Sequence, residues 1–240
     1  MTQLPGPPAA ARTLLAEQLM LLAFPAEGPL RMGPGSYLSA GLVGAVLTEL
    51  TIGRCVTIDQ QGRSAGRYRV VPLGPRTGDP LLDGLADRIA AQPPNTLSWW
   101  IRRGANRSAL HTEVLARLTG QGLVTTSRGL LRSHSRLVSP AVRADPADRL
   151  QRALLIDPAQ AGQLWSSDPW SASLTSLAFA CGVASGLGWL PRPQRSAARA
   201  TVKAIRSTDP IGQAVAAFVS AQANAAASSA TMTTTMISSG

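Results

Sequence analysis

Residues 169–191 read PWSASLTSLAFACGVASGLGWLP, an uncharged run with a proline at each end. Its length matches the roughly 20 residues of a membrane-spanning helix, but five hydroxyl residues and three glycines keep its hydrophobicity modest. A helix that is apolar on all sides is also what the centre of a large helical bundle requires. We therefore predict a buried helix over residues 169–190, at the centre of a soluble bundle.

The composition of the rest of the chain supports a folded bundle. Of the 240 residues, 45% are hydrophobic and only 15% are charged, which excludes a charge-rich disordered polypeptide. A chain of this length buries roughly 70% of its unfolded surface. We expect a single helical domain over residues 13–227. The Pro/Ala-rich residues 1–12 are expected to be flexible, and the Ser/Thr/Met-rich residues 228–240 to be disordered.

Asp-Pro dipeptides predict where several helices begin. Aspartate accepts hydrogen bonds from the free N–H groups of a first helical turn, and proline fits the first helical position because it lacks an N–H. Five such pairs occur, and apolar residues follow them at spacings of three and four. They are Asp79-Pro80, Asp145-Pro146, Asp157-Pro158, Asp168-Pro169 and Asp209-Pro210. Asp79 is interpreted as an N-cap that asparagine could replace at little cost.

Other elements follow from pattern alone. Apolar spacing predicts helices over residues 13–24, 36–52 and 108–118. Alternating residues on either side of turns predict hairpins over residues 54–71 and 123–138. The predicted fold class is therefore mainly α: a helical bundle around a buried apolar central helix, with two short β-hairpins.

Positive charge is concentrated in one part of the chain. The formal net charge is +10, and +7 of it lies between residues 99 and 152. This segment holds three carboxylates and ten arginines, which are Arg102, Arg103, Arg107, Arg117, Arg128, Arg132, Arg136, Arg143, Arg149 and Arg152. Guanidinium groups bind phosphate in a bidentate manner, so the pattern favours a polyanionic partner. The adjacent Trp99-Trp100 pair could insert into a membrane interface, but one of the pair is expected in the core.

The sequence contains no motif typical of a catalytic or metal site. His111 and His134 have no acidic sequence neighbour and no second histidine at a metal-ligand spacing. Cys55 and Cys181 lie in apolar surroundings and are interpreted as buried thiols. We expect no enzymatic activity, no metal site and no cofactor.

The order of five motifs resembles the Golgi phosphoprotein 3 family. The motifs are LAEQLMLL at 15–22, LSAGLVGAVLTEL at 38–50, TGDPLLD at 77–83, QPP at 92–94 with Trp100-Ile101, and LTGQGLV at 118–124. The resemblance covers about residues 13–220, and TGDPLLD is its most specific part. The alanine- and arginine-rich composition is more similar to bacterial relatives than to the Golgi proteins.

The resemblance implies a helical domain that associates peripherally with membranes through phosphatidylinositol 4-phosphate. In eukaryotic members it also implies binding to the cytoplasmic tails of Golgi glycosyltransferases. The family's lipid pocket uses one tryptophan and three arginines. By register, these positions are occupied here by Pro34, Val43, Ser108 and His111, and none keeps the family residue.

The sequence therefore predicts a cytoplasmic, peripheral membrane protein that binds anionic phospholipid headgroups. Its predicted site residues are Arg31, Arg103, Arg107, Ser108, His111, Arg132 and Arg136. Because the family pocket residues are replaced, we expect little preference for phosphatidylinositol 4-phosphate over other lipids of equal charge. His111 and His134 are expected to add affinity below about pH 6.5, where imidazole gains positive charge.

Two alternatives stay open at this level. The first is a protein–protein adaptor that binds no lipid, and the 123–138 hairpin could also join copies of the chain. The second is a winged-helix DNA reader, since helix 108–118 precedes two short strands that carry arginines. The weakly basic helix makes a nucleic-acid partner the less favoured of the two.

Overall fold

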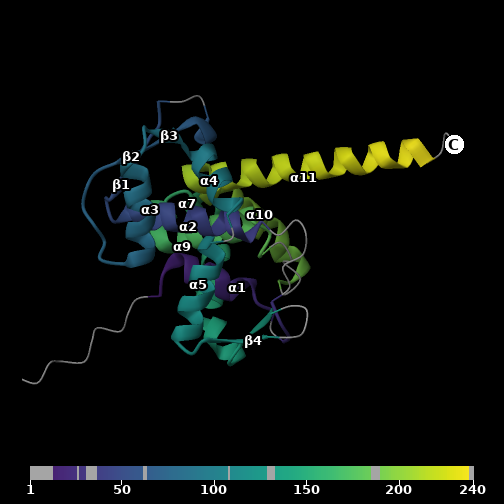
Figure 1. The fold of residues 1–240 in the computed structure, drawn as a ribbon. Helices are drawn as coiled ribbons and strands as arrows, with labels where there is room; N and C mark the ends of the chain where they lie inside the picture. Colours follow the sequence, from purple (N-terminus) through teal and green to yellow (C-terminus); the bar gives the residue numbers. More distant parts are fainter. Residues whose placement is uncertain are drawn as a thin grey trace, which may run out of the picture.

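The structure is a computed structural model that describes residues 13–25, 27–30, 37–61, 64–107, 109–128, 133–184 and 190–237. The predicted flexible segment 1–12 lies outside these residues, as do the predicted site residues Arg31, Ser108 and Arg132 and the family position Pro34. Within the described residues the chain is mainly helical, as the sequence predicts, and Figure 1 shows the helices gathered into one body from which a single long helix projects.

The helices follow one another with few strands between them. They are α1 (Leu15–Ala23), α2 (Leu38–Ile52), α3 (Pro80–Ala90), α4 (Leu97–Ala105), α5 (Ala109–Gly120), α6 (Ala144–Leu154), α7 (Pro158–Ala161), α8 (Leu164–Ser167), α9 (Pro169–Ala180), α10 (Arg192–Ser207) and α11 (Pro210–Ile237). Two 3₁₀ turns, η1 (Ala65–Arg67) and η2 (Pro140–Arg143), complete the helical elements.

Two helices supply much of the core. Most residues of α2 are buried, and α9 is buried from Ser171 to Ala178 and packs against α1, α2, α6, α8, α10 and α11. One buried hydroxyl of α9 bonds within the helix: Thr175 Oγ1 donates to the carbonyl of Ser171 over 2.8 Å. The predicted central helix is shorter than expected, because Gly182 adopts a φ of +80° that an α-helix cannot continue through. Residues 185–189 lie outside the described part.

Both predicted strand pairs are present. β1 (Val56–Asp59) pairs antiparallel with β2 (Arg69–Pro72), and β4 (Val124–Arg128) pairs antiparallel with β5 (Ser133–Leu137). The first pair is not an isolated hairpin, because the two-residue strand β3 (Asn95–Thr96) pairs with β2 and makes a three-stranded sheet. So short a strand carries no alternating pattern from which it could be predicted.

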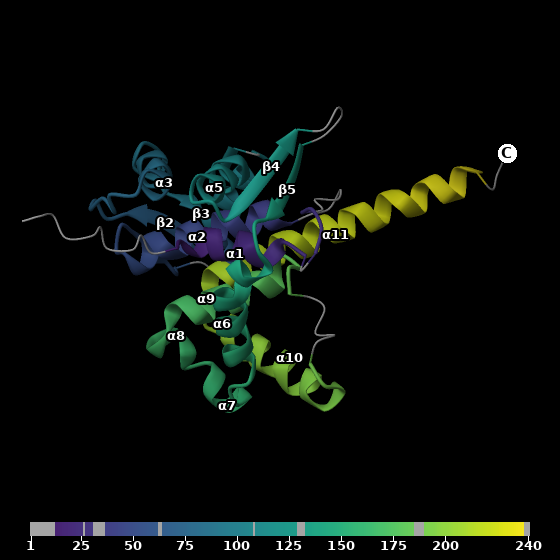
Figure 2. The same cartoon turned by 90° about the horizontal axis from the view of Figure 1, so that it is seen from below.

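The two ends of the body carry different helices. Figure 2 shows α3 and α5 at one end, with α7 and α10 at the other. Helix α11 packs against α2, α4 and α9 through its first half, and residues 220–228 are exposed where it projects from the body. The helix extends to Ile237, into residues 228–240 for which the sequence predicts disorder. Residues 238–240 are outside the described part.

Four of the five Asp-Pro pairs begin helices as predicted. Asp79, Asp157 and Asp168 are the N-caps of α3, α7 and α9, and Asp209 accepts a hydrogen bond from Ile211 N at the start of α11. The prediction for Asp145 was wrong. The 3₁₀ turn η2 leads directly into α6, so this helix begins before the Asp-Pro pair.

Among the described residues, no helix combines the length and the apolarity that crossing a membrane requires. The 12 residues of α9 span about 18 Å, which is shorter than a bilayer's hydrocarbon core of about 30 Å.

Candidate functional site

A cavity of about 330 Å³ lies between α3, α4 and α5, at the end of the body away from α10. We call it the arginine cavity. Its lining comprises Val43, Leu81, Leu85, Arg88, Gln92, Trp100, Arg103, Gly104, Arg107, Ala109, Leu110 and Glu113. The buried residues of this set are apolar, whereas the exposed ones include three arginines and one glutamate. The cavity therefore has an apolar interior and a positively charged mouth.

The three arginines at the mouth come from separate segments. Arg88 belongs to the last turn of α3, Arg103 to α4, and Arg107 to the α4–α5 connection. The structure describes no ion pair for any of them. Arg103 lies over the ring of Trp99, with 4.9 Å between its Cζ and the ring centroid. This stacking orients one guanidinium and leaves its hydrogen-bond donors available.

Close packing behind the mouth sets the shape of the cavity. A Cβ atom at Gly104 would lie inside contact distance of Val43, so α4 approaches α2 this closely only because residue 104 is glycine. Trp100 is buried, and its ring meets that of Trp99 edge-on with 4.8 Å between centroids. The prediction that one tryptophan of the pair belongs to the core is confirmed.

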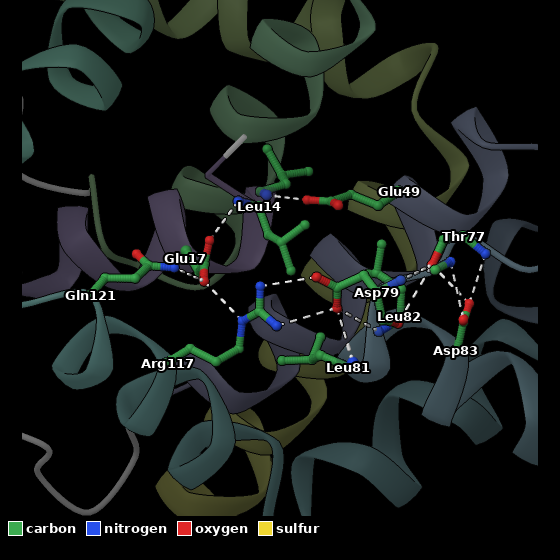
Figure 3. A network of polar contacts seen from close by, with 12 residues as sticks. Leu14, Glu17, Glu49, Thr77, Asp79, Leu81, Leu82, Asp83, Arg117 and Gln121 are labelled. Carbon is green, nitrogen blue, oxygen red and sulfur yellow. Dashed lines mark hydrogen bonds and ion pairs between the residues drawn. The ribbon is translucent and has the colours of Figure 1, made fainter. Parts of the chain in front are cut away.

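Next to the cavity, a polar network joins α1, α3 and α5 (Figure 3). Arg117 Nε donates to Glu17 Oε1 and Arg117 Nη2 to Asp79 Oδ2, each over 2.9 Å. Glu17 is fully buried and also accepts hydrogen bonds from Leu14 N and Gln121 Nε2. A buried carboxylate needs such partners, because burial without them carries a large desolvation cost. The network thus holds together α3 and α5, two of the three helices that enclose the cavity.

The TGDPLLD motif forms a compact turn in this network. Asp79 Oδ1 accepts from Leu81 N over 2.9 Å, which caps α3 as the sequence predicts. Asp83 Oδ1 accepts from both the hydroxyl and the N–H of Thr77, over 2.7 and 2.8 Å. Gly78 has a φ of +83°, which strongly favours glycine. Each polar residue of the motif therefore has a structural role.

Because Asp79 also pairs with Arg117, asparagine at this position is expected to cost more than its capping ability suggests. Asp79→Asn keeps the cap but loses a charged hydrogen bond, for an expected destabilisation of about 1.5 kcal/mol. Asp79→Ala also removes the N-cap, so it should destabilise the protein by about 1 kcal/mol more than Asp79→Asn. Urea unfolding measures both, with Asp157→Asn as the control, since Asp157 caps α7 without an ion pair among the described residues. Equal stability of Asp79→Asn and wild type would contradict the role of the pair.

Comparison with known families agrees with the motif order. The family model described as Golgi phosphoprotein 3 (GPP34) matches residues 15–222. The chain belongs to the Golgi phosphoprotein 3 family. No curated protein matches the chain in a separate comparison.

The predicted site residues of this Golgi phosphoprotein 3 family member fall in different places. Arg103 and Arg107 line the arginine cavity, as does Val43, the residue for which the sequence resemblance predicts a family arginine position. Arg136 is exposed on β5 and is not part of the cavity lining. His111 is partly buried on α5, and burial lowers its pKa, so the expected gain of charge below about pH 6.5 is corrected: the imidazole stays neutral to lower pH.

Sequence reasoning missed Arg88, Gln92 and Glu113 at the cavity. A signal existed for Arg88, because it stands seven residues after Leu81 and three after Leu85 and so shares their helical face. Glu113 likewise stands three residues after Leu110 on α5 and shares its helical face. Gln92 lies beyond the end of α3, so no helical spacing predicts its place at the opening.

The described residues hold no group of three or more His, Cys, Asp or Glu side chains suited to a metal ion. The helix and hairpin of the winged-helix interpretation are present as α5, β4 and β5. However, Arg117, the arginine of α5, forms ion pairs with Glu17 and Asp79. It is therefore not available to contact the phosphates of DNA.

Proposed function

We propose that this member of the Golgi phosphoprotein 3 family docks peripherally on anionic membranes and that the arginine cavity receives a phospholipid headgroup. The observation that carries the proposal is the position of Arg88, Arg103 and Arg107 around one opening. With Glu113 as the single carboxylate in the lining, the formal charge there is +2. The apolar interior suits the less polar part of a headgroup and its glycerol.

The proposal includes weak discrimination between anionic headgroups. Val43 lines the cavity with an aliphatic side chain. The sequence resemblance implies an arginine of the family at this position, so one donor to an inositol phosphate would be missing. The remaining arginines attract any phosphate through charge, worth roughly 1 kcal/mol per residue near a negative leaflet. Affinity should therefore follow the negative charge of the membrane and fall steeply with salt.

The test is vesicle flotation of a cavity variant against a charge-matched control. The cavity variant carries Arg88→Gln, Arg103→Gln and Arg107→Gln. The control carries Arg67→Gln, Arg69→Gln and Arg152→Gln, three exposed residues outside the cavity. Vesicles contain phosphatidylglycerol, cardiolipin or phosphatidylinositol 4-phosphate at equal total charge in neutral lipid.

We expect the cavity variant to lose at least about tenfold in membrane partitioning, equivalent to 1.4 kcal/mol. The control should retain most of the wild-type binding, and the three vesicle types should differ little. Equal loss in both variants would contradict a role of the cavity, because it would indicate attraction by total charge alone. Absence of flotation by the wild type would contradict the membrane proposal and favour the adaptor interpretation.

A further inference from the structure

A second cluster of cations lies on α10, at the other end of the body from the arginine cavity (Figure 2). Arg192, Arg195, Arg199, Lys203 and Arg206 recur every three or four residues, and α10 contains no carboxylate. This spacing places them along one side of the helix. The adjacent face is used for packing, since Ala198, Val202 and Ile205 are buried. Three of the five cations, Arg192, Arg199 and Lys203, are exposed beside this packed face.

The C-terminal part of this stripe surrounds a shallow hollow of about 420 Å³. We call it the α10 hollow. It is lined by Phe179, Arg199, Val202, Lys203, Arg206, Ser207 and Gln213. Arg199 and Lys203 are exposed, and Arg206 is partly buried. Three cations from successive turns thus face one opening, and none of them forms an ion pair within the described residues.

Cations near a helix C-terminus often serve to bind its free carbonyl groups, but here other donors occupy those groups. Gln213 Nε2 donates to the carbonyls of Arg206 and Ser207, over 3.0 and 2.9 Å. Ser207 Oγ donates to the carbonyl of Ala204, and Thr208 Oγ1 to that of Ile205. The last four carbonyls of α10 are therefore satisfied without Lys203 or Arg206.

Asp209 interacts with Arg206 through charge but forms no ion pair with it within the described residues. Its carboxyl group is fully buried, and this burial raises its pKa although the charge of Arg206 lowers it. Arg206 Nε is buried and has no hydrogen-bond acceptor in the described structure. The guanidinium that borders the hollow thus lacks part of its usual complement of acceptors.

We propose that the α10 hollow binds a phosphate dianion through Arg199, Lys203 and Arg206. Phosphate offers several acceptor oxygens and two negative charges, which match three converging cations. Its source is a soluble phosphorylated molecule, because a membrane held at the arginine cavity lies at the opposite end of the body. The choice of a soluble source rests on the proposed membrane function, whereas the phosphate site itself does not.

The test uses calorimetric titration of inorganic phosphate at constant ionic strength. The starting protein is the cavity variant with Arg88, Arg103 and Arg107 changed to Gln, so that the arginine cavity does not contribute. Adding Arg199→Gln and Lys203→Gln removes two exposed cations of the hollow. The matched control adds Arg152→Gln and Arg192→Gln, which are exposed and lie outside the hollow.

We expect saturable phosphate binding by the starting protein and by the control. The double substitution at the hollow should weaken that binding at least about tenfold per lost cation. Absence of saturable binding in the starting protein, or equal weakening in the control, would overturn the proposal. Circular dichroism melts verify that both proteins are folded.

Vesicle flotation of wild type against Arg199→Gln/Lys203→Gln then identifies the source of the phosphate. Unchanged flotation, together with lost phosphate binding, supports a soluble ligand. Loss of flotation as large as that of the cavity variant would overturn the soluble source and assign the hollow to a lipid headgroup. If the wild type does not float at all, the proposed membrane function is wrong. The phosphate titration then still tests whether the α10 hollow binds phosphate.

Discussion

Arg117→Ala is expected to destabilise the protein by about 3 kcal/mol, measured by urea unfolding. Arg117 is the shared ion-pair partner of Glu17 on α1 and Asp79 at the start of α3, with N–O distances of 2.9 Å to each. Removing one partner of a buried pair costs about 3–5 kcal/mol, because the other charge stays buried and uncompensated. The lower end of this energy range applies to Arg117, because its side chain is 28% exposed and that of Asp79 is 23% exposed.

A double-mutant cycle separates the ion pair from the packing of the side chain. Arg117→Met and Glu17→Gln together remove both charges, and the double variant should be more stable than the sum of the single losses predicts, by about 1–3 kcal/mol. Arg76→Ala serves as the control, because Arg76 pairs with Asp87 over 2.8 Å while both side chains are more than half exposed. Its expected cost is below about 1 kcal/mol. Strictly additive losses in the cycle would contradict the network's role.

Local features of the fold could be predicted from the sequence because their causes are local. A carboxylate before a proline caps a helix through atoms two or three residues away, and Asp79, Asp157 and Asp168 do so. The β1–β2 strand pair and the β4–β5 hairpin also depend on nearby residues. The end of α9 was misplaced because uncharged residues continue past Gly182, and composition does not record its positive φ.

The ion-pair network could not be predicted in this way. Arg117 lies 100 residues from Glu17 and 38 from Asp79, and no periodic pattern relates positions so far apart. A partial signal was present, because Glu17 stands with Gln18 among the apolar residues of α1, and its side chain proves to be fully buried. A carboxylate at such a position requires a cation from elsewhere in the chain, but the sequence does not identify which arginine supplies it.

The candidate site could be predicted only in part, because it also depends on contacts between residues far apart in the sequence. Arg103 and Arg107 were found because they stand in the segment of highest positive charge, and both line the arginine cavity. The same criterion also selected Arg136, which lies on β5 outside the cavity. It overlooked Arg88, which precedes that segment and reaches the opening through the packing of α3. Charge density along the chain thus indicates the kind of ligand, while tertiary packing determines which arginines converge.

Gly212→Ala is expected to destabilise the protein by about 3 kcal/mol, at the upper end of the usual cost of overpacking. An added Cβ would lie inside contact distance of Ser176 Oγ and Asp209 Oδ2, and 3.0 Å from Ser176 Cβ. Both neighbours are fully buried, so neither can move into solvent. The start of α11 would have to shift away from α9. Gly84→Ala in α3 is the control, since no atom lies within 4 Å of its Cβ and the change should be neutral or stabilising.

Gly212→Ala is also expected to weaken phosphate binding at the α10 hollow. Gln213 directly follows Gly212, and its amide holds the carbonyls of Arg206 and Ser207 at the end of α10. An outward shift of α11 breaks these hydrogen bonds and frees two carbonyl oxygens, which then compete with phosphate for Lys203 and Arg206. Gly212→Ala should therefore weaken phosphate binding at temperatures where the variant is still folded, whereas Gly84→Ala should not. Wild-type stability and unchanged phosphate affinity in Gly212→Ala would show that α11 does not depend on this close contact.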